Sequence, residues 1–581
     1  MQKIAKALFV VVALILASHS IVGLPSLIVF PSYVLLLLLM VFLTQKEKLR
    51  LADRVLLILG ISVLTSLSYA LVPFYVADRF PDANYINQLI RNYKAIGKVI
   101  TGIGTNQAYD YSYYPFEEVL MMILSEVSGV LNTLILRLFP FFNTLFLIIV
   151  WTCIYKTFLE PKEVYVALTI ALTSFHLLVV FTRPLHPTFG LMFTSLLFLV
   201  WTARNAYMGR ARKIDTLVSS IFIIAIVLYH NTTALLISTL FILSLLLIIV
   251  LNFLNKLPFP KLKNNGWKFS NGIKRRREIF YYIVLMLATY FAWNIYIAWN
   301  FFKLNIVIAI IEYIHMILSH EVIPLEILFG FSKGMKINIV GFNEFATQLA
   351  IMKTRIGYSS LALYLLLSGV MILKYMLCNA SLSQNKKTKH VANIFVLLSL
   401  SSALVILFGA LTWSYTFARD YYWRFYSYYF LFSSPITVFM LTRFRSFKQS
   451  VKPIIIFAIL LNSILWMPSS SLGIDMPCEF SDPRFGMTQA IVLSKFIHDK
   501  YDERYIAGTR FVYNIIGPLS ERWVTKVIYL ESDYLTFINQ KKNIPTIISI
   551  TESLIIGFQD YSFRKYNILY NSNNFVMLIG T

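Results

Sequence analysis

Two carboxylates, Asp78 and Asp82, lie where a long apolar stretch gives way to a polar, aromatic-rich segment. A carboxylate can take the proton of an attacking hydroxyl group, or it can hold a cation that neutralises a departing phosphate. Asp82 also follows Pro81 and precedes an amphipathic stretch, so capping of a helix N-terminus is a competing interpretation. We predict that the pair is catalytic and leave open which aspartate acts as the base.

Arginine and histidine residues elsewhere in the chain could recognise an anion. Arg419, Asp420 and Arg424 occur together in SYTFARDYYWRFYSYY. A guanidinium group binds phosphate through two parallel hydrogen bonds, although an arginine among aromatic residues also suits a membrane-surface anchor. His230 lies in a polar turn, where it could assist a phosphate or simply hydrogen-bond the backbone. The predicted phosphate-binding residues are Arg419, Arg424 and His230, and the predicted accessory residues are Arg183, His186 and Asp420.

Membrane helices must position these side chains. The chain has 581 residues, of which 58% are hydrophobic and only 14% are charged, whereas about a quarter are charged in a soluble domain. A run of about 20 apolar residues crosses a bilayer core as a helix. We predict an all-α polytopic membrane protein with about 13 transmembrane helices, near 7–23, 25–44, 54–77, 137–157, 163–182, 187–206, 214–229, 231–252, 280–302, 356–378, 392–414, 424–442 and 452–467.

Basic residues predict the orientation of these spans. With the N-terminus in the cytoplasm, the cytoplasmic segments hold 28 of the 52 Lys and Arg residues. The predicted outside turns at 23–25 and 230–231 hold none, and the turn at 183–187 holds Arg183 alone. Cytoplasmic loops are generally enriched in Lys and Arg. The aspartates, the His230 turn and the Arg419–Arg424 segment are therefore all predicted on the outer face of a plasma membrane.

The net charge of +24 has the same explanation. The Lys and Arg residues of the chain cluster in short loops between spans, as the cytoplasmic loops of membrane proteins do. We therefore expect no nucleic-acid partner. The three cysteines show no CxxC spacing that would indicate a metal site. The N-terminal apolar stretch lacks a convincing cleavage site, and we expect it to be retained as the first helix.

Two domains are predicted. The transmembrane domain covers 1–467 and carries two large outside loops, 78–136 and 303–355. The first loop contains two amphipathic stretches, around Tyr85–Ile96 and Phe116–Leu131, which we expect to lie along the membrane surface. The remainder, 468–581, is predicted to be a small extracytoplasmic α/β domain, with a helix at 487–501 and strands in RYIAGT, KVIYL, PTIISI and NFVMLIG.

The layout resembles the GT-C superfamily of polytopic glycosyltransferases, in particular prokaryotic relatives of the protein O-mannosyltransferases and the aminoarabinose transferases. The residues that carry the resemblance are DRFPDANYINQLIRNYKAIGKV, YSYYPFEEVLMMILSEVSGV and LRLFPFF, together with YHNTTALL and RFYSYYFLFSSP. The family usually places its acidic loop after the first span, whereas here it follows the third. The common Asp-Glu pair is replaced by DRFPD, which leaves both the base and any metal requirement open.

The resemblance implies a membrane glycosyltransferase working on the outer face. Its donor would be a polyprenyl-phosphate sugar that enters from the surrounding membrane lipids, and its acceptor would be a lipid, a glycan or a protein. No cofactor is implied, except that Asp78 and Asp82 could hold a divalent cation. The alternatives are an envelope glycan polymerase or ligase with a diphosphate-linked donor, and a lipid-glycan transporter or flippase without chemistry. Peripheral charges and the lack of an internal repeat speak against the transporter.

Overall fold

A computed structural model gives the fold of the protein. It describes residues 2–22, 26–46, 48–66, 89–90, 93–94, 96–99, 113–130, 132–174, 177–178, 186–206, 213–254, 272–303, 307, 311, 344–382, 386–411, 416–443, 451–466, 505–508, 526–529, 546–549, 567–571 and 575–579.

Helices dominate the described part of the chain up to residue 466. They are α1 (Gln2–Val22), α2 (Ser26–Thr44), α3 (Leu51–Ser66), α5 (Phe116–Ser128), α6 (Asn132–Tyr155), α7 (Pro161–Leu172), α9 (His186–Ala206), α10 (Lys213–Tyr229), α11 (Asn231–Leu254), α13 (Gly272–Tyr296), α14 (Trp299–Phe302), α17 (Glu344–Leu382), α18 (Lys386–Leu411), α19 (Thr416–Arg443), α20 (Val451–Leu460) and the 3₁₀ helix η3 (Leu461–Trp466).

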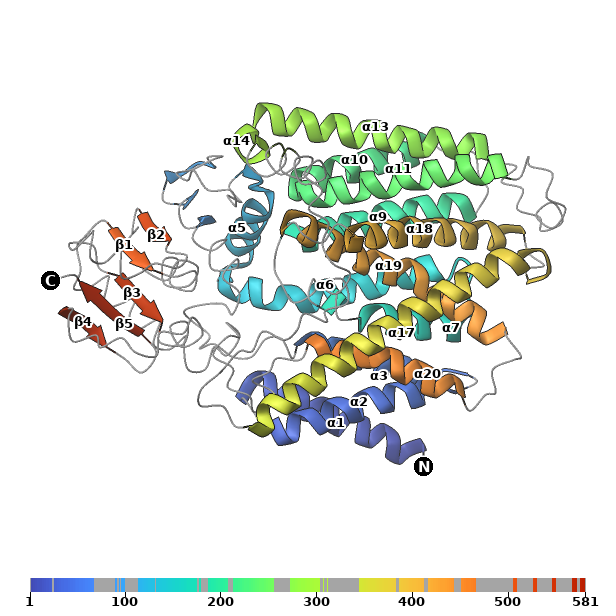
Figure 1. Ribbon diagram of the computed structural model, residues 1–581, viewed down its shortest axis with the longest axis horizontal. Helices are drawn as coiled ribbons and strands as arrows, with labels where there is room; N and C mark the ends of the chain where they lie inside the picture. The colour runs from blue at the N-terminus through green and yellow to red at the C-terminus, as the bar shows by residue number, and fades with distance from the viewer. Residues whose placement is uncertain are drawn as a thin grey trace.

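The long helices run side by side along the length of the molecule, and α5 runs across their direction near one end (Figure 1). Within the described residues, three helical segments are long and apolar enough to cross a membrane: Thr232–Leu251, Arg277–Tyr296 and Arg355–Met376. By their length and composition these segments support a helical membrane protein, and shorter apolar helices accompany them. The C-terminus lies at the end of the long axis where the sheet is found, and the N-terminus lies at the lower edge of the helical body (Figure 1).

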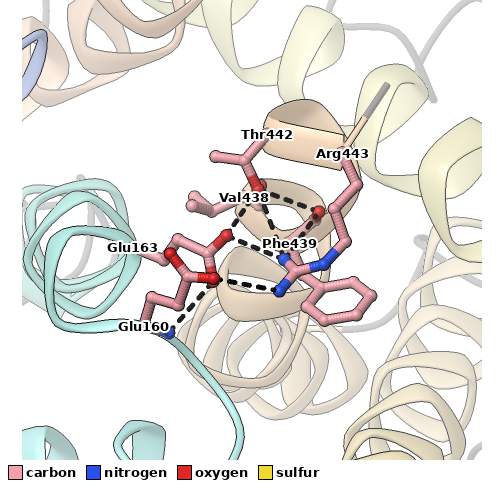
Figure 2. A network of polar contacts seen from close by, with 6 residues as sticks. All are labelled: Glu160, Glu163, Val438, Phe439, Thr442 and Arg443. Carbon is pink, nitrogen blue, oxygen red and sulfur yellow. Dashed lines mark hydrogen bonds and ion pairs between the residues drawn. The ribbon is translucent and has the colours of Figure 1, made fainter. Parts of the chain in front are cut away.

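A charged network joins α7 to α19 at the end of the helical body opposite to α5 (Figures 1 and 2). Glu163, which is 5% exposed, accepts bonds from Arg443 Nη1 at 2.7 Å and from Thr442 Oγ1 at 2.6 Å. Its second oxygen accepts the backbone N–H of Glu160 at 3.1 Å, as part of a capping box that starts α7. The network therefore ties the beginning of α7 to the last turn of α19.

Pro435 interrupts the hydrogen-bond ladder of α19. A proline has no backbone N–H, so the carbonyl of Leu431, four residues earlier, loses its helical partner. The hydroxyl of Tyr155, at the end of α6, donates to that carbonyl at 2.7 Å. In hydrocarbon a carbonyl without a partner costs several kcal/mol, so this bond lets α19 keep a proline in its interior.

Several helix ends differ from the predicted spans. The split between α10 and α11 at His230 is confirmed. α7 ends at Leu172 rather than near 182, because Thr173 caps it through its backbone N–H and its hydroxyl. α17 begins at Glu344, within the predicted loop 303–355, and α19 begins at Thr416, so the expected loop at 415–424 is largely helical.

A mixed sheet forms from β1 (Tyr505–Gly508), β2 (Lys526–Tyr529), β3 (Thr546–Ser549), β4 (Asn567–Asn571) and β5 (Phe575–Ile579). Among the described strands the order is β2-β1-β3-β5-β4. The pairs β2-β1 and β1-β3 are parallel, and the pairs β3-β5 and β5-β4 are antiparallel. Four strands occupy the four predicted segments, and β4 was not predicted. Parallel neighbours need crossover connections, but the predicted helix at 487–501 lies outside the described residues, so the α/β assignment stays a prediction.

The sheet lies beyond the end of the helical body at which α5 and α14 are found (Figure 1). That end also carries the junction of α10 and α11. The residues predicted to do chemistry at His230 and Arg424 therefore share one end of the molecule with α5 and the sheet.

Candidate functional site

His230 connects α10 to α11 and caps the second helix. Its backbone N–H continues α10 by donating to Ile226 O at 3.0 Å, and its carbonyl accepts from Ala234 N at 3.2 Å. Its Nδ1 accepts the backbone N–H of Thr233 at 3.1 Å and contacts Thr233 Oγ1 at 2.6 Å. The side chain is 7% exposed. The first turn of α11 thus holds the imidazole in one orientation.

Arg424 meets the opposite edge of the same imidazole. Its Nη1 lies 3.2 Å from His230 Nε2, although the two residues are 194 positions apart in the chain. α19 and α11 are in contact, which brings the two side chains together. The pairing of Arg424 with His230 links two of the three residues that were predicted to bind phosphate.

Both ring nitrogens of His230 make polar contacts, and the tautomer of the ring sets their roles. A backbone N–H can only donate, so the Nδ1 atom that receives Thr233 N–H carries a lone pair. That bond favours the tautomer with its proton on Nε2, whereas an Nε2 that accepts from Arg424 requires the proton on Nδ1, where Thr233 Oγ1 can accept it. The guanidinium of Arg424 is also a donor and never an acceptor. A phosphate oxygen has the charge and the lone pairs to accept from the guanidinium of Arg424 and from a protonated imidazole at His230.

Gly190 of α9 lets Thr233 approach closely. A Cβ atom added at Gly190 would lie 2.6 Å from Thr233 Oγ1 and 2.9 Å from Thr233 Cβ. Thr233 is branched at Cβ and cannot move aside without leaving its rotamer. The absence of a side chain at Gly190 therefore preserves the contact between Thr233 and His230.

Two carboxylates at the start of α5 point into the protein. Glu117 and Glu118 are both 0% exposed, and the buried face of α5 also includes Met121 and Ser125. The apolar side of the helix is exposed instead, with Val127 exposed to 84%. An apolar face turned outward suits a helix that lies in the membrane interface, and it leaves the acidic face directed inward.

Aromatic contacts place α5 beside the His230 turn. The ring of Tyr229, the residue before His230, lies 5.8 Å from that of Phe116, 5.3 Å from that of Phe189 and 5.0 Å from that of Phe193. Glu117 is near enough to Tyr229 to interact with it electrostatically. The inward carboxylates, the histidine and the arginine thus occupy neighbouring positions at one end of the helices.

The start of α5 is also tied to α13. The hydroxyl of Tyr114 donates to Asn294 Oδ1 at 2.8 Å, and Trp293 Nε1 donates to the carbonyl of Tyr113 at 3.3 Å. The ring of Trp293 lies 5.7 Å from that of Phe116. These contacts fix the first turn of α5, which carries the two glutamates.

The remaining predicted site residues are not placed. Asp78, Asp82 and Arg183 lie outside the described residues. The backbones of His186, Arg419 and Asp420 are helical, in α9 and α19, but their side chains lie outside the described part. Among the described side chains, no group of three His, Cys, Asp or Glu residues could hold a metal ion. The catalytic aspartates and the divalent cation therefore stay predictions.

Sequence reasoning missed Glu117, Glu118, Thr233 and Gly190. The two glutamates could have been found, because they fall between the apolar positions of a stretch already recognised as amphipathic. Thr233 and Gly190 gave no comparable signal, since their role depends on contact between separate helices.

No protein-family model matches this chain, and no curated protein matches it. Solved structures to which it is similar include archaeal oligosaccharyltransferase AglB from Archaeoglobus fulgidus, in complex with an inhibitory peptide and a dolichol-phosphate. The match has a TM-score of 0.49 and 10% identity, and it covers 91% of this chain and 74% of AglB. ArnT from Cupriavidus metallidurans bound to undecaprenyl phosphate matches with a TM-score of 0.37 and 13% identity, covering 91% of this chain and 98% of ArnT. Its apo state matches with the same score and identity.

AglB and ArnT are both members of the GT-C superfamily, which is also the superfamily that the sequence resembles.

Proposed function

We propose that this protein is a membrane glycosyltransferase that moves a sugar from a polyprenyl-phosphate donor to a lipid, glycan or protein acceptor at the outer face of the membrane. The observation that carries the proposal is the pairing of Arg424 Nη1 with His230 Nε2 at 3.2 Å. A guanidinium and an imidazole converge there beside aromatic side chains, at the end of helices that suit a bilayer. Such a site suits the phosphate of a lipid-linked sugar.

The reaction requires one bond to form and one to break. The acceptor oxygen bonds to the anomeric carbon of the sugar as the bond from that carbon to the phosphate oxygen breaks. The proton of the acceptor hydroxyl passes to a carboxylate, and the lipid phosphate leaves with the electron pair. Arg424 and His230 would stabilise the charge that develops on the departing phosphate. Asp82 or Asp78 remains the proposed base, and Glu117 and Glu118 add two inward carboxylates next to Tyr229.

Substitution of Arg424 tests the proposal. In vesicles that contain the purified protein, Arg424→Gln should lower sugar transfer from a radiolabelled polyprenyl-phosphate sugar by more than tenfold, because one charge-assisted partner of the phosphate is removed. Arg424→Lys should restore only part of the activity, since an ammonium group cannot make the two-pronged contact. Arg355→Gln, which changes an exposed arginine of α17, is the matched control and should leave transfer unchanged. Full transfer by Arg424→Gln would overturn the proposed phosphate site.

The carboxylates are tested in the same assay. Four variants each remove one candidate base: Asp78→Asn, Asp82→Asn, Glu117→Gln and Glu118→Gln. A variant that loses transfer but still binds the donor would identify the base. Full activity in both aspartate variants would exclude the proposed roles of Asp78 and Asp82.

Comparing donors separates the alternatives. A polyprenyl-diphosphate sugar that is used in preference to the monophosphate would indicate a glycan polymerase or ligase. Movement of a lipid-linked glycan across the vesicle membrane without a glycosylated product would indicate a flippase.

A further inference from the structure

We infer that the groove between α1 and α3 at their N-terminal ends is a binding site for an anionic phospholipid, separate from the proposed phosphate site at Arg424. The groove has a volume of about 520 Å³. It is lined by Lys6, Ala7 and Val10 of α1 and by Leu51, Ala52, Val55 and Leu56 of α3.

The lining is almost entirely apolar, with Lys6 at its edge and the ammonium group of Lys6 paired with Asp53. Lys6 is the charged residue of the lining, and its side chain is 28% exposed. Val10 follows one helical turn further along α1 and is 38% exposed, and Val55 is 54% exposed on α3. One turn of helix advances about 5.4 Å. A phosphate at the level of Lys6 would therefore place the first methylene groups of its acyl chain against the two valines.

Asp53 holds the ammonium group of Lys6 in position, and its single negative charge does not cancel the charges of both Lys6 and Lys46. Its Oδ1 lies 2.8 Å from Lys6 Nζ and 2.6 Å from Lys46 Nζ, while its Oδ2 accepts the backbone N–H of Arg50 at 3.1 Å. Burial by itself would raise the pKa of Asp53, but the hydrogen bonds from Lys46, Lys6 and Arg50 outweigh it and lower the pKa to about 2. The carboxylate is thus ionised at neutral pH and shared by two lysines, so the three groups together keep one net positive charge beside the residues that line the groove.

Further cations lie close to the lining residues along the chain. Lys3, Lys48 and Arg50 are all exposed, and the segments 3–6 and 46–54 contain six cations against two carboxylates. Each basic residue near an anionic bilayer surface contributes about 1 kcal/mol of attraction. Charge complementarity therefore selects an anionic phospholipid over a zwitterionic one, and the apolar floor selects a lipid over free phosphate.

Lipid retention by the purified full-length protein tests this site. Native mass spectrometry would compare phosphatidylglycerol with phosphatidylcholine of the same acyl chains. We expect preferential retention of phosphatidylglycerol. Lys6→Gln should lower that retention about fivefold, which corresponds to about 1 kcal/mol at 25 °C, and should leave phosphatidylcholine unchanged. Lys213→Gln, an exposed lysine at the start of α10, is the matched control.

A second variant separates binding from folding. Ala52→Leu fills the groove and leaves all three groups of the ion-pair cluster in place, so it should lower the retention of both lipids. Equal retention of the two lipids by the unmodified protein would overturn the inference, and so would identical behaviour of Lys6→Gln and Lys213→Gln. Displacement of phosphatidylglycerol by an equal concentration of soluble glycerol 3-phosphate would also overturn it, because the acyl chain would then contribute nothing.

Discussion

At the scale of single residues, His230 has two tasks that its two ring nitrogens divide. Nδ1 caps α11 by accepting Thr233 N–H at 3.1 Å, and Nε2 faces Arg424 Nη1 at 3.2 Å. The capping role holds the ring still, so that the second nitrogen has a defined direction. The sequence suggested two roles for this residue: a turn histidine bonded to the backbone, and a partner of phosphate. One side chain can fill both roles, because each uses a different ring nitrogen.

Replacing His230 with asparagine or alanine should separate these tasks. Asparagine is a preferred N-cap residue and can still accept Thr233 N–H, but it has no group in place of Nε2. We expect His230→Asn to retain thermal stability and to weaken donor binding about tenfold. His230→Ala should also lose about 1 kcal/mol of stability, because the cap disappears. Unfolding midpoints and donor dissociation constants measure the two effects, and unaltered donor binding in His230→Asn would assign the residue to capping alone.

A single methyl group at Gly190 should disturb the same site from a distance. In Gly190→Ala the new Cβ would meet Thr233 Oγ1 at 2.6 Å, so Thr233 must shift and its contact with His230 must weaken. We expect donor affinity to fall several-fold with a modest loss of stability.

The control for this prediction is Gly369→Ala in α17. A Cβ at Gly369 has no atom within 4 Å, and alanine stabilises a helix relative to glycine by about 0.5 to 1 kcal/mol. This variant should keep full donor affinity. Equal donor affinity in both alanine variants would show that the position of Thr233 does not matter.

At the scale of elements, α19 carries the site residue Arg424 in its N-terminal third and the network with α7 at its last turn. Arg424 and Arg443 are 19 residues apart and no residue between them is charged, which corresponds to about 28 Å of helix. That length matches the hydrocarbon core of a bilayer, about 30 Å. The ion pair of Arg443 with Glu163 (Figure 2) and the bond from Tyr155 to Leu431 therefore fix the depth and the path of the helix that presents Arg424.

A double-mutant cycle tests the support of the proline in α19. Tyr155→Phe removes the donor to Leu431 O, and we expect it to destabilise the protein by about 1 kcal/mol. In a Pro435→Ala background the alanine N–H can take over that carbonyl, so the same substitution should cost clearly less. Tyr282→Phe, whose hydroxyl donates to Ser219 at 3.3 Å, serves as a control and should show no coupling to Pro435→Ala. Unfolding in detergent measures all three, and additive effects of Tyr155→Phe and Pro435→Ala would contradict the assignment.

At the scale of the whole molecule, the polar features of the helices separate toward two ends. The His230 turn, Arg424 and the inward glutamates of α5 share one end with the sheet, and the clusters around Asp53 and Glu163 belong to basic segments at the other (Figure 1). The distribution of Lys and Arg predicts that the second end is cytoplasmic. The proposed chemistry would then take place outside the cell, away from the inferred lipid groove.

Cysteine labelling tests this orientation. In a variant without Cys153, Cys378 and Cys478, Ser128→Cys at the exposed end of α5 should react with a membrane-impermeant maleimide in intact cells. Lys48→Cys, also exposed, should react only after the membrane is permeabilised. The reverse pattern would place the Arg424 site in the cytoplasm and contradict the proposed outer-face reaction.

The sequence alone determined the local features of this protein. It predicted the apolar helices, the break at His230, the amphipathic stretch that forms α5 and four of the strands, because each depends on neighbouring residues and on the period of a helix or a strand. It also singled out His230 and Arg424 by residue type. Hydropathy does not specify which helices meet, since lipid tails are as apolar as the side chains that face them.

Only the tertiary structure decided how these parts combine. It brought Arg424 opposite His230 across 194 positions, gave Gly190 its importance through Thr233, and turned Glu117 and Glu118 inward. These outcomes depend on close packing and on hydrogen bonds between helices far apart in the chain, which no local pattern encodes.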